Sequence, residues 1–275
     1  MKFTVLGSTG FIGSNLCSFL EKQNIAYFAP GRNYKFTPDE NLGHVVYAIG
    51  LTADFRQRPL ETVDAHVCKL LEVLRTCRYE SFLYLSATRV YARIDHLAAE
   101  TSNLIMDVND PGDLYNISKI MGEAVCLSFP NDKIRIARLS NVVGDDWNSE
   151  NFIYSILKEI KVSEKLLLRS EPESCKDYIV INDVVNLLYE ISLKGRFRIF
   201  NVAGGRNIST RELLDFISDR VEFSYQVAKG SPVISFPQID ISRIKENFSF
   251  VPGDIFDKLD QVISVYFKKN SNDSN

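Results

Sequence analysis

The chain is poor in the residues that bind metals or form disulfides. It has only three histidines, His44, His66 and His96, which are far apart in the sequence. Its five cysteines are odd in number and never stand in a Cys-x-x-Cys pair. They are Cys17, Cys68, Cys77, Cys126 and Cys175. These spacings exclude a disulfide framework and the common zinc motifs, so we expect reduced cysteines and no metal site.

Long apolar runs and basic blocks are also missing from the 275 residues. No stretch reaches the roughly 20 apolar residues that a membrane-spanning helix needs. The first residues lack the charged start and the small-residue cleavage site of a signal peptide. The net charge of -3 gives no electrostatic reason to bind nucleic acid or an anionic membrane. We therefore expect a cytoplasmic protein whose partner is a small molecule.

Short apolar strands alternate with amphipathic helices along most of the chain. Strands are predicted at 2–6, 25–29, 43–49, 81–85, 133–138 and 177–181, and helices at 11–22, 62–77, 113–127 and 152–160. The tail adds a strand near 223–227 and helices at 209–219, 242–247 and 253–267. Repeated strand–helix units imply right-handed crossovers and a parallel sheet covered on both faces. We predict an α/β fold with a smaller second domain in the tail.

Three glycines lie in the turn between the first predicted strand and the first predicted helix, in VLGSTGFIGSNL (Val5–Leu16). Backbone N–H groups and the positive end of a helix in such a turn can hold a diphosphate. A side chain at Gly7 or Gly10 would block the approach of the ligand, and one at Gly13 would push the helix off the sheet. Because a glycine pattern alone is weakly specific, a plain turn is the alternative.

A tyrosine and a lysine stand four residues apart in DLYNISKIMGEA, within a predicted helix. Tyr115 and Lys119 therefore lie on one face, about one turn apart. A neighbouring ammonium favours the phenolate and lowers the pKa of a tyrosine, so this pair can move a proton. Alone, Tyr-x-x-x-Lys is common on helix surfaces and indicates little. In this chain it follows a predicted dinucleotide-binding turn, which favours a functional pair.

Six short motifs span nearly the whole chain. They are GSTGFIG (Gly7–Gly13), LSATRVY (Leu85–Tyr91), YNISK (Tyr115–Lys119), RLSNVVG (Arg138–Gly144), KDYIVINDV (Lys176–Val184) and FNVAGG (Phe200–Gly205). In these motifs and their order the chain resembles the extended short-chain dehydrogenase/reductase family, in its nucleotide-sugar epimerase/dehydratase branch. The resemblance implies a doubly wound Rossmann-type domain, 1–142 plus 176–202, and a smaller α+β substrate domain, 143–175 plus 203–275.

The resemblance also implies a nicotinamide cofactor at the carboxyl ends of the strands, with a nucleotide sugar between the two domains. Tyr115 would be the catalytic acid/base at a sugar oxygen, and Lys119 would bind the nicotinamide ribose and tune Tyr115. The implied cofactor contacts are Gly7, Thr9, Gly10, Phe11, Ile12, Gly13, Arg32, Ala48, Ser86, Tyr115 and Lys119.

Two further residues match positions that face the substrate in this family. Asn141, in RLSN, stands where relatives touch the sugar diphosphate, and Lys176 stands where relatives usually carry an arginine. The alternatives are a turn-forming asparagine and a solvated loop lysine. A lysine can pair with phosphate as a point charge, without the bidentate fork of arginine.

The LSATRVY segment departs from the family pattern at Ala87, where relatives place a catalytic Ser or Thr. Ser86 and Thr88 flank it, and on an extended strand both point to the opposite face. Either Thr88 or Ser86 takes over, or the site works with Tyr115 alone. The branch's 4,6-dehydratases follow this position with an Asp-Glu pair; Thr88 and Arg89 stand there instead, which argues against dehydration.

The second predicted strand is followed by Gly31 and Arg32, without the acidic residue that an NAD site offers to the adenosine ribose. NADP is therefore favoured over NAD; the alternative is that Arg32 is an exposed loop arginine with no role in cofactor binding.

The loop Gly50–Pro59 lies on the cofactor side in the predicted fold and is unusual in sequence. Its residues Asp54 and Arg56 either line the site or pair with each other on the surface. In this family the two corresponding helices often pack against their copies. The resemblance therefore implies a homodimer formed by the helices that contain Val67 and Tyr115.

These observations favour an NADP(H)-dependent oxidoreductase that acts on a nucleotide-linked sugar, in the first place a keto-sugar reductase. An epimerase that works through a transient keto sugar would use the same residues. An alternative of another class is a catalytically weak NADP-binding sensor or scaffold, which Ala87 supports and Tyr115 and Lys119 oppose.

Overall fold

A computed structural model describes residues 1–51, 55–146 and 151–268. Its centre is a six-stranded parallel sheet with the strand order β2-β1-β3-β4-β5-β9. The strands are β1 (Phe3–Leu6), β2 (Tyr27–Phe28), β3 (His44–Tyr47), β4 (Ser81–Ala87), β5 (Ile134–Leu139) and β9 (Ile199–Val202). In a parallel sheet all carboxyl ends lie along one edge, where ligands of such folds bind.

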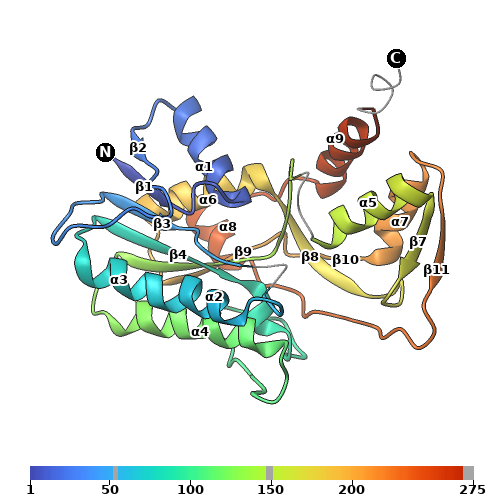
Figure 1. Cartoon of the computed structure of the whole chain (residues 1–275), viewed down its shortest axis with the longest axis horizontal. Helices are drawn as coiled ribbons and strands as arrows, with labels where there is room; N and C mark the ends of the chain where they lie inside the picture. Colours follow the sequence, from blue (N-terminus) through green and yellow to red (C-terminus); the bar gives the residue numbers. More distant parts are fainter. Residues whose placement is uncertain (52–54, 147–150, 269–275) are drawn as a thin grey trace.

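Helices cover both faces of this sheet (Figure 1). One face carries α1 (Phe11–Lys22) and α6 (Ile181–Lys194), and the other carries α2 (Pro59–Val63), α3 (Lys69–Thr76) and α4 (Asp113–Ser128). Each face has its own apolar core: Leu16 and Leu188 are fully buried on the first, Leu70 and Phe82 on the second. Burial on both faces explains why the strands read as continuous apolar runs.

The structure confirms the predicted α/β class and refines several elements. The second strand is two residues long, much shorter than the predicted 25–29. The predicted helix 62–77 is three pieces, because a π-helical turn, Asp64–Cys68, joins α2 to α3. Strand β9 was not predicted. Such π-helical turns are frequent at functional sites.

A second group of elements forms its own apolar core, drawn at the right of Figure 1. It contains a three-stranded sheet, ordered β10-β8-β6, and a two-stranded sheet of β11 and β7. Its elements are β6 (Asn141–Val143), α5 (Phe152–Ser163), β7 (Lys165–Leu168), β8 (Cys175–Val180), β10 (Asn207–Ser209), α7 (Thr210–Ser218), β11 (Ser224–Val227) and α9 (Ile255–Lys268). Within the segment 176–202, β8 thus belongs to the small sheet, while α6 and β9 belong to the large one.

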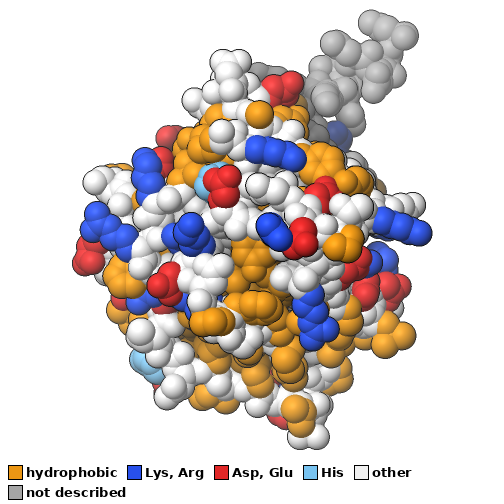
Figure 2. Space-filling model, turned by 90° about the vertical axis from the view of Figure 1, so that its left-hand side faces the viewer, with side chains coloured by type: hydrophobic (Ala, Val, Ile, Leu, Met, Phe, Trp, Pro, Cys, Tyr) orange, Lys and Arg blue, Asp and Glu red, His pale blue; other side chains and the backbone are white. Residues whose placement is uncertain are grey.

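The surface mixes charges of both signs. Figure 2 shows basic and acidic side chains interspersed, with apolar side chains gathered in its lower half, the side on which α3 and α4 lie in Figure 1. Helix α8 (Ser242–Phe248) comes late in the chain but belongs to the large sheet. It packs on β9 through Ile244 and Phe248. Among the described residues, no helix is long and apolar enough to cross a membrane.

Candidate active site

The glycine turn after β1 requires two of its three glycines for the fold itself. Gly7 has φ +87°, and a Cβ there would lie 2.7 Å from the carbonyl carbon of Ala48. A Cβ at Gly13 would lie 2.2 Å from the Gly7 carbonyl oxygen. Both positions therefore exclude side chains because neighbouring backbone fills the space. At Gly13 the obstacle is the turn itself rather than the sheet.

Gly10 differs from the other two glycines because the protein leaves it room. Its φ of -80° suits any residue, and a Cβ there would meet only the Gly7 oxygen, at 3.4 Å. Gly10 is also the N-cap of α1, where no side chain caps the helix and no acidic residue lies in the first turn. Free N–H groups at an uncapped helix N-terminus form a site for an anion. Gly10 thus keeps open a space that a bound phosphate can fill.

The other residues of the predicted cofactor site lie around this turn. Thr9 precedes the N-cap, Phe11 and Ile12 open α1, and Ala48 follows β3, with its N–H donating to the Leu6 oxygen at 2.8 Å. Arg32 is exposed after β2, and a Cβ added to the adjacent Gly31 would have no atom within 4 Å. The parallel sheet brings the turn, Ala48 and Arg32 to one edge.

Tyr115 and Lys119 are both buried on α4, where it packs on β4. The Lys119 ammonium donates to the Leu85 carbonyl oxygen at 2.9 Å and lies 5.9 Å from the centre of the Tyr115 ring. Burial lowers the pKa of Lys119 to about 7 against a smaller opposing effect of Glu123. Burial likewise raises the pKa of Tyr115 to about 12, while the charge of Arg89 lowers it. Arg89 is thus a second cation near Tyr115, besides the predicted Lys119.

Ser86, Ala87 and Thr88 lie at the carboxyl end of β4. The Ser86 hydroxyl is buried and has no hydrogen-bond partner among the described residues. Thr88 is also buried and begins a short 3-10 turn, Thr88–Tyr91. Ala87 is half-buried and extended, with φ -140° and ψ 145°. Strand alternation therefore sets Ser86 on the face opposite Ala87, while Thr88 lies beyond the end of β4, in the 3-10 turn.

His66, which the sequence left as a structural residue, contacts Tyr115 from the π-helical turn. Its ring meets the Tyr115 ring edge-on, with 5.3 Å between the centres. Its Nδ1 lies 2.8 Å from the Ser118 hydroxyl, which donates to the Tyr115 carbonyl oxygen at 2.8 Å. Burial lowers the pKa of His66 to about 2, so the ring is neutral. His66 therefore positions Tyr115 by packing and through Ser118.

The loop before α2 supplies an aromatic wall and a cation. Phe55 is buried, and its ring centre lies 5.2 Å from that of Tyr115. The guanidinium carbons of Arg56 and Arg89 lie 4.5 and 5.7 Å from the same Phe55 ring centre. Sequence reasoning considered Arg56 and missed Phe55 and Arg89 as site residues. Asp54, proposed with Arg56, lies outside the described residues.

The two predicted substrate residues lie in the small sheet. The Asn141 amide donates to the Asp177 carbonyl oxygen at 2.8 Å, which ties β6 to β8. Lys176 is half-buried, with its ammonium 4.4 Å from the centre of the Phe152 ring. Burial and the charge of Arg89 lower the pKa of Lys176. Lys176 and Arg89 are therefore close enough to repel each other, although they come from different sheets.

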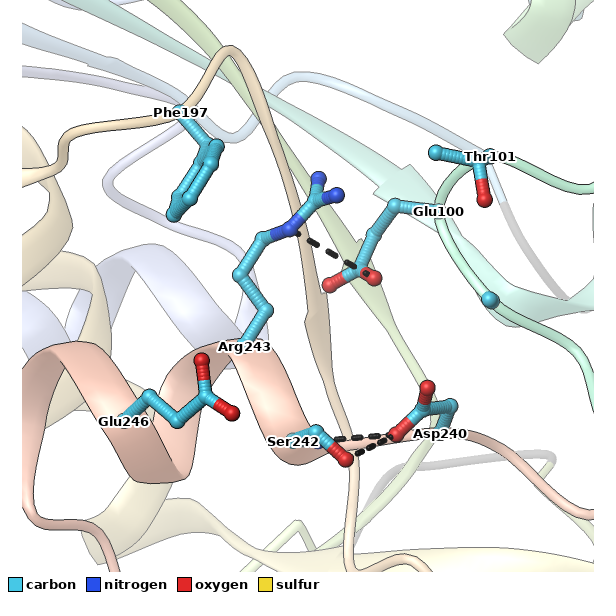
Figure 3. Close-up of a pocket in the computed structure, with 8 residues that line it drawn as sticks. Glu100, Thr101, Phe197, Asp240, Ser242, Arg243 and Glu246 are labelled. Atoms are coloured by element: carbon cyan, nitrogen blue, oxygen red, sulfur yellow. Dashed lines mark hydrogen bonds and ion pairs between the residues drawn. The ribbon is translucent and has the colours of Figure 1, made fainter.

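A separate cavity of about 260 Å³ opens beside α8 (Figure 3). It is lined by Ala99, Glu100, Thr101, Phe197, Asp240, Ser242, Arg243 and Glu246. Its charges are engaged within the protein: Arg243 pairs with Glu100 at 3.7 Å, and Ser242 donates to Asp240 at 2.6 Å. None of the predicted site residues lines it, so the candidate active site stays the one around Tyr115.

The fold and the site define a class: a dinucleotide-binding α/β enzyme with a buried Tyr-x-x-x-Lys pair. The chain belongs to the NAD dependent epimerase/dehydratase family, whose sequence model matches residues 34–203. The family predicted from the six motifs is thus confirmed. Across the part of the chain that the structure describes, no cluster of three His, Cys, Asp or Glu side chains could hold a metal ion.

Individual proteins with similar sequences support this family assignment. The chain is 23% identical over 313 aligned residues to the uncharacterized UDP-glucose epimerase YtcB of Bacillus subtilis (strain 168), covering 92% of this chain and 93% of YtcB. It is 25% identical over 275 residues to the trifunctional UDP-glucose 4,6-dehydratase/UDP-4-keto-6-deoxy-D-glucose 3,5-epimerase/UDP-4-keto-L-rhamnose-reductase RHM1 of Arabidopsis thaliana. That match covers 90% of this chain and only 40% of RHM1.

A solved structure shows the same fold. RMD of Pseudomonas aeruginosa, complexed with NADPH, superposes with a TM-score of 0.79 at 19% identity, covering 97% of this chain and 99% of that one. At this identity the likeness concerns the fold alone. It confirms the α/β class predicted from the alternation of strands and helices and the Rossmann-type architecture that the family resemblance implied.

Proposed function

We propose that the chain transfers hydride between NADP(H) and a nucleotide-linked sugar, and that its net reaction is reduction of a keto sugar. The observation that carries this proposal is the buried Tyr115–Lys119 pair at the carboxyl end of β4, beside Ser86. This edge of the sheet also carries the glycine turn and the free N-terminus of α1. Family membership and the similarity to RHM1, whose name includes a keto-sugar reductase, support it.

The residues present fit a nicotinamide dinucleotide, because Gly10 leaves space where α1 offers free N–H groups. When bound, the reduced cofactor supplies a hydride to the carbonyl carbon of the sugar. Tyr115 gives its hydroxyl proton to the carbonyl oxygen as charge develops there, and Arg89 stabilises the phenolate that remains. With a pKa of about 7, Lys119 exists in both protonation states near neutral pH and can hold the proton that restores Tyr115.

The preference for NADP rests on Arg32. It follows β2 and is exposed, with no acidic residue beside it in APGRN, so its charge is available to a 2′-phosphate. Arg32→Glu should weaken NADP binding about tenfold or more and favour NAD, since it replaces attraction by repulsion. Titration of both cofactors checks this; an unchanged ratio of the two dissociation constants would contradict it.

For the nucleotide sugar we propose a place between the large and the small sheet. Lys176 and Asn141 would face its diphosphate, since both lie on the small sheet's strands and Lys176 stands close to Arg89. Of the hydroxyls at the end of β4, Thr88 and Ser86 are the candidates to assist Tyr115. The free hydroxyl of Ser86 favours it as a donor to the cofactor or the sugar.

The test is turnover of NADPH with UDP-4-keto-6-deoxy-D-glucose, followed by the absorbance of the reduced nicotinamide. Tyr115→Phe should lower kcat by about 100- to 10,000-fold, the usual contribution of a positioned acid, and leave cofactor affinity unchanged. Tyr225→Phe, on the exposed strand β11, is the matched control and should keep full activity. Unchanged turnover of Tyr115→Phe would refute the mechanism.

Epimerisation is the second candidate function, because it uses the same pair and the family contains epimerases. An epimerase would interconvert two sugar nucleotides with no net change in reduced cofactor. A sensor or scaffold, the reading that Ala87 supports, would bind cofactor and turn over no sugar at all. The same absorbance experiment, combined with analysis of the sugar products, separates the three.

A homodimer is also proposed. Helix α4 carries two large apolar side chains that are exposed, Met121 at 52% and Leu127 at 39%. Large exposed apolar side chains are found at subunit interfaces. Light scattering should give twice the chain mass of 31.3 kDa, and Met121→Glu should halve it. A monomeric wild-type protein would refute the proposal.

A further inference from the structure

Arg89 has two other cations close to it, Arg56 and Lys176, and the three come from separate segments of the chain. Arg56 and Arg89 both lie over the Phe55 ring, which itself packs on Tyr115. Burial lowers the pKa of both Lys176 and Arg89; the charge of Arg89 lowers that of Lys176 further, and the charge of Arg56 lowers that of Arg89. Like charges at such spacing repel, so this arrangement costs free energy in the folded protein.

Arg89 makes no ion pair with any residue that the structure describes. Its Nε is buried without a hydrogen-bond partner. The acids that act on it from nearby, Asp110 and Asp113, are both engaged by Arg93, at 2.8 Å each. A half-buried guanidinium whose Nε has no acceptor destabilises the folded protein, since buried charges are normally paired. A bound anion would supply this acceptor.

The position of Arg89 decides which part of the substrate supplies this anion. Its charge acts on Tyr115, whose hydroxyl must lie at the reacting carbon of the sugar. Lys176, on β8, carries a single point charge, which suits a phosphate. The planar fork of Arg89 suits a carboxylate held in two parallel hydrogen bonds.

We propose that the substrate is a nucleotide-linked sugar acid, whose carboxylate binds Arg89 next to the carbon on which Tyr115 acts. Arg56, on the same Phe55 ring, adds a second positive charge to this subsite. The inference rests on the proposed function and adds the chemical class of the sugar to it. Arg89 is then a specificity residue that distinguishes an acidic sugar from its neutral counterpart.

The experiment compares matched substrate pairs that differ only in this carboxylate: UDP-glucuronic acid with UDP-glucose, and GDP-mannuronic acid with GDP-mannose. Dissociation constants are measured with NADP present. In the pair that the protein recognises, the acidic member should bind about 10- to 100-fold more tightly than the neutral member, the range expected for charge-assisted hydrogen bonds. Arg89→Gln should abolish that preference while leaving the affinity for the neutral sugar nearly unchanged, and Arg89→Lys should restore part of it.

Arg211→Gln is the control, because Arg211 is an exposed arginine that pairs with Glu173 at the surface of the small domain. It should keep the full preference, and thermal melting of each variant verifies that it folds. Equal binding of both members of a pair would overturn this inference alone. A loss of affinity for both members in Arg89→Gln would place Arg89 at the diphosphate and also overturn it. Binding of neither pair would overturn the proposed function as well.

Discussion

Burial of Lys119 makes the stability of the protein depend on pH in a defined way. Its pKa falls from the ordinary 10.5 to about 7, because the ammonium is removed from water. At about 1.36 kcal/mol per pKa unit, keeping it charged costs the folded state on the order of 5 kcal/mol. Below pH 7 the lysine is protonated in both states, and the folded protein bears this whole cost.

Between pH 7 and 10.5 the folded state holds a neutral lysine while the unfolded chain keeps its proton. The unfolded state then binds more protons, so the free energy of unfolding rises with pH by up to about 1.4 kcal/mol per unit. The destabilisation caused by the buried Lys119 ammonium is therefore complete below pH 7, decreases as the pH rises from 7 to 10.5, and is absent above 10.5.

The assay is urea unfolding of the protein without cofactor at several pH values from 7 to 9, for the wild type and Lys119→Met. Loss of the bond to the Leu85 carbonyl oxygen shifts the variant by an amount that does not depend on pH. The difference between the two proteins should therefore change by about 2 to 3 kcal/mol across this range, with the wild type gaining toward pH 9. A difference that stays constant with pH would refute the buried, neutral lysine.

Gly10→Ala should fold normally and lose cofactor affinity by about tenfold or more, whereas Gly13→Ala should lower the melting temperature sharply, because its Cβ meets the Gly7 oxygen. Equal melting temperatures for the two variants would contradict the distinction. Glu123→Gln should destabilise the protein by about 3 to 5 kcal/mol, since it leaves the buried Arg138, now paired with Glu123 at 2.6 Å, without its counter-charge. A loss below about 1 kcal/mol in urea unfolding would contradict that role.

Much of the catalytic side of the site could be predicted from the sequence because it depends on local spacing. Tyr115 and Lys119 share a face of one helix by periodicity alone, and the glycine turn follows from its place between a strand and a helix. The alternation of strands and helices likewise determined the α/β class. Each of these inferences depends on patterns within single elements or on the order of neighbouring elements along the chain.

The tertiary structure decided what these residues meet. His66, Phe55 and Arg89 contact or act on Tyr115 from segments 26 to 60 positions away, so no local pattern could place them there. The same holds for the hydrogen bond of the Lys119 ammonium, which goes to the Leu85 oxygen 34 positions away. Periodicity fixes which face of an element is buried, while packing of distant elements determines the partners on that face. The pairing of Tyr115 with Lys119 could therefore be predicted from the sequence, and the position of Arg89 near Tyr115 only from the fold.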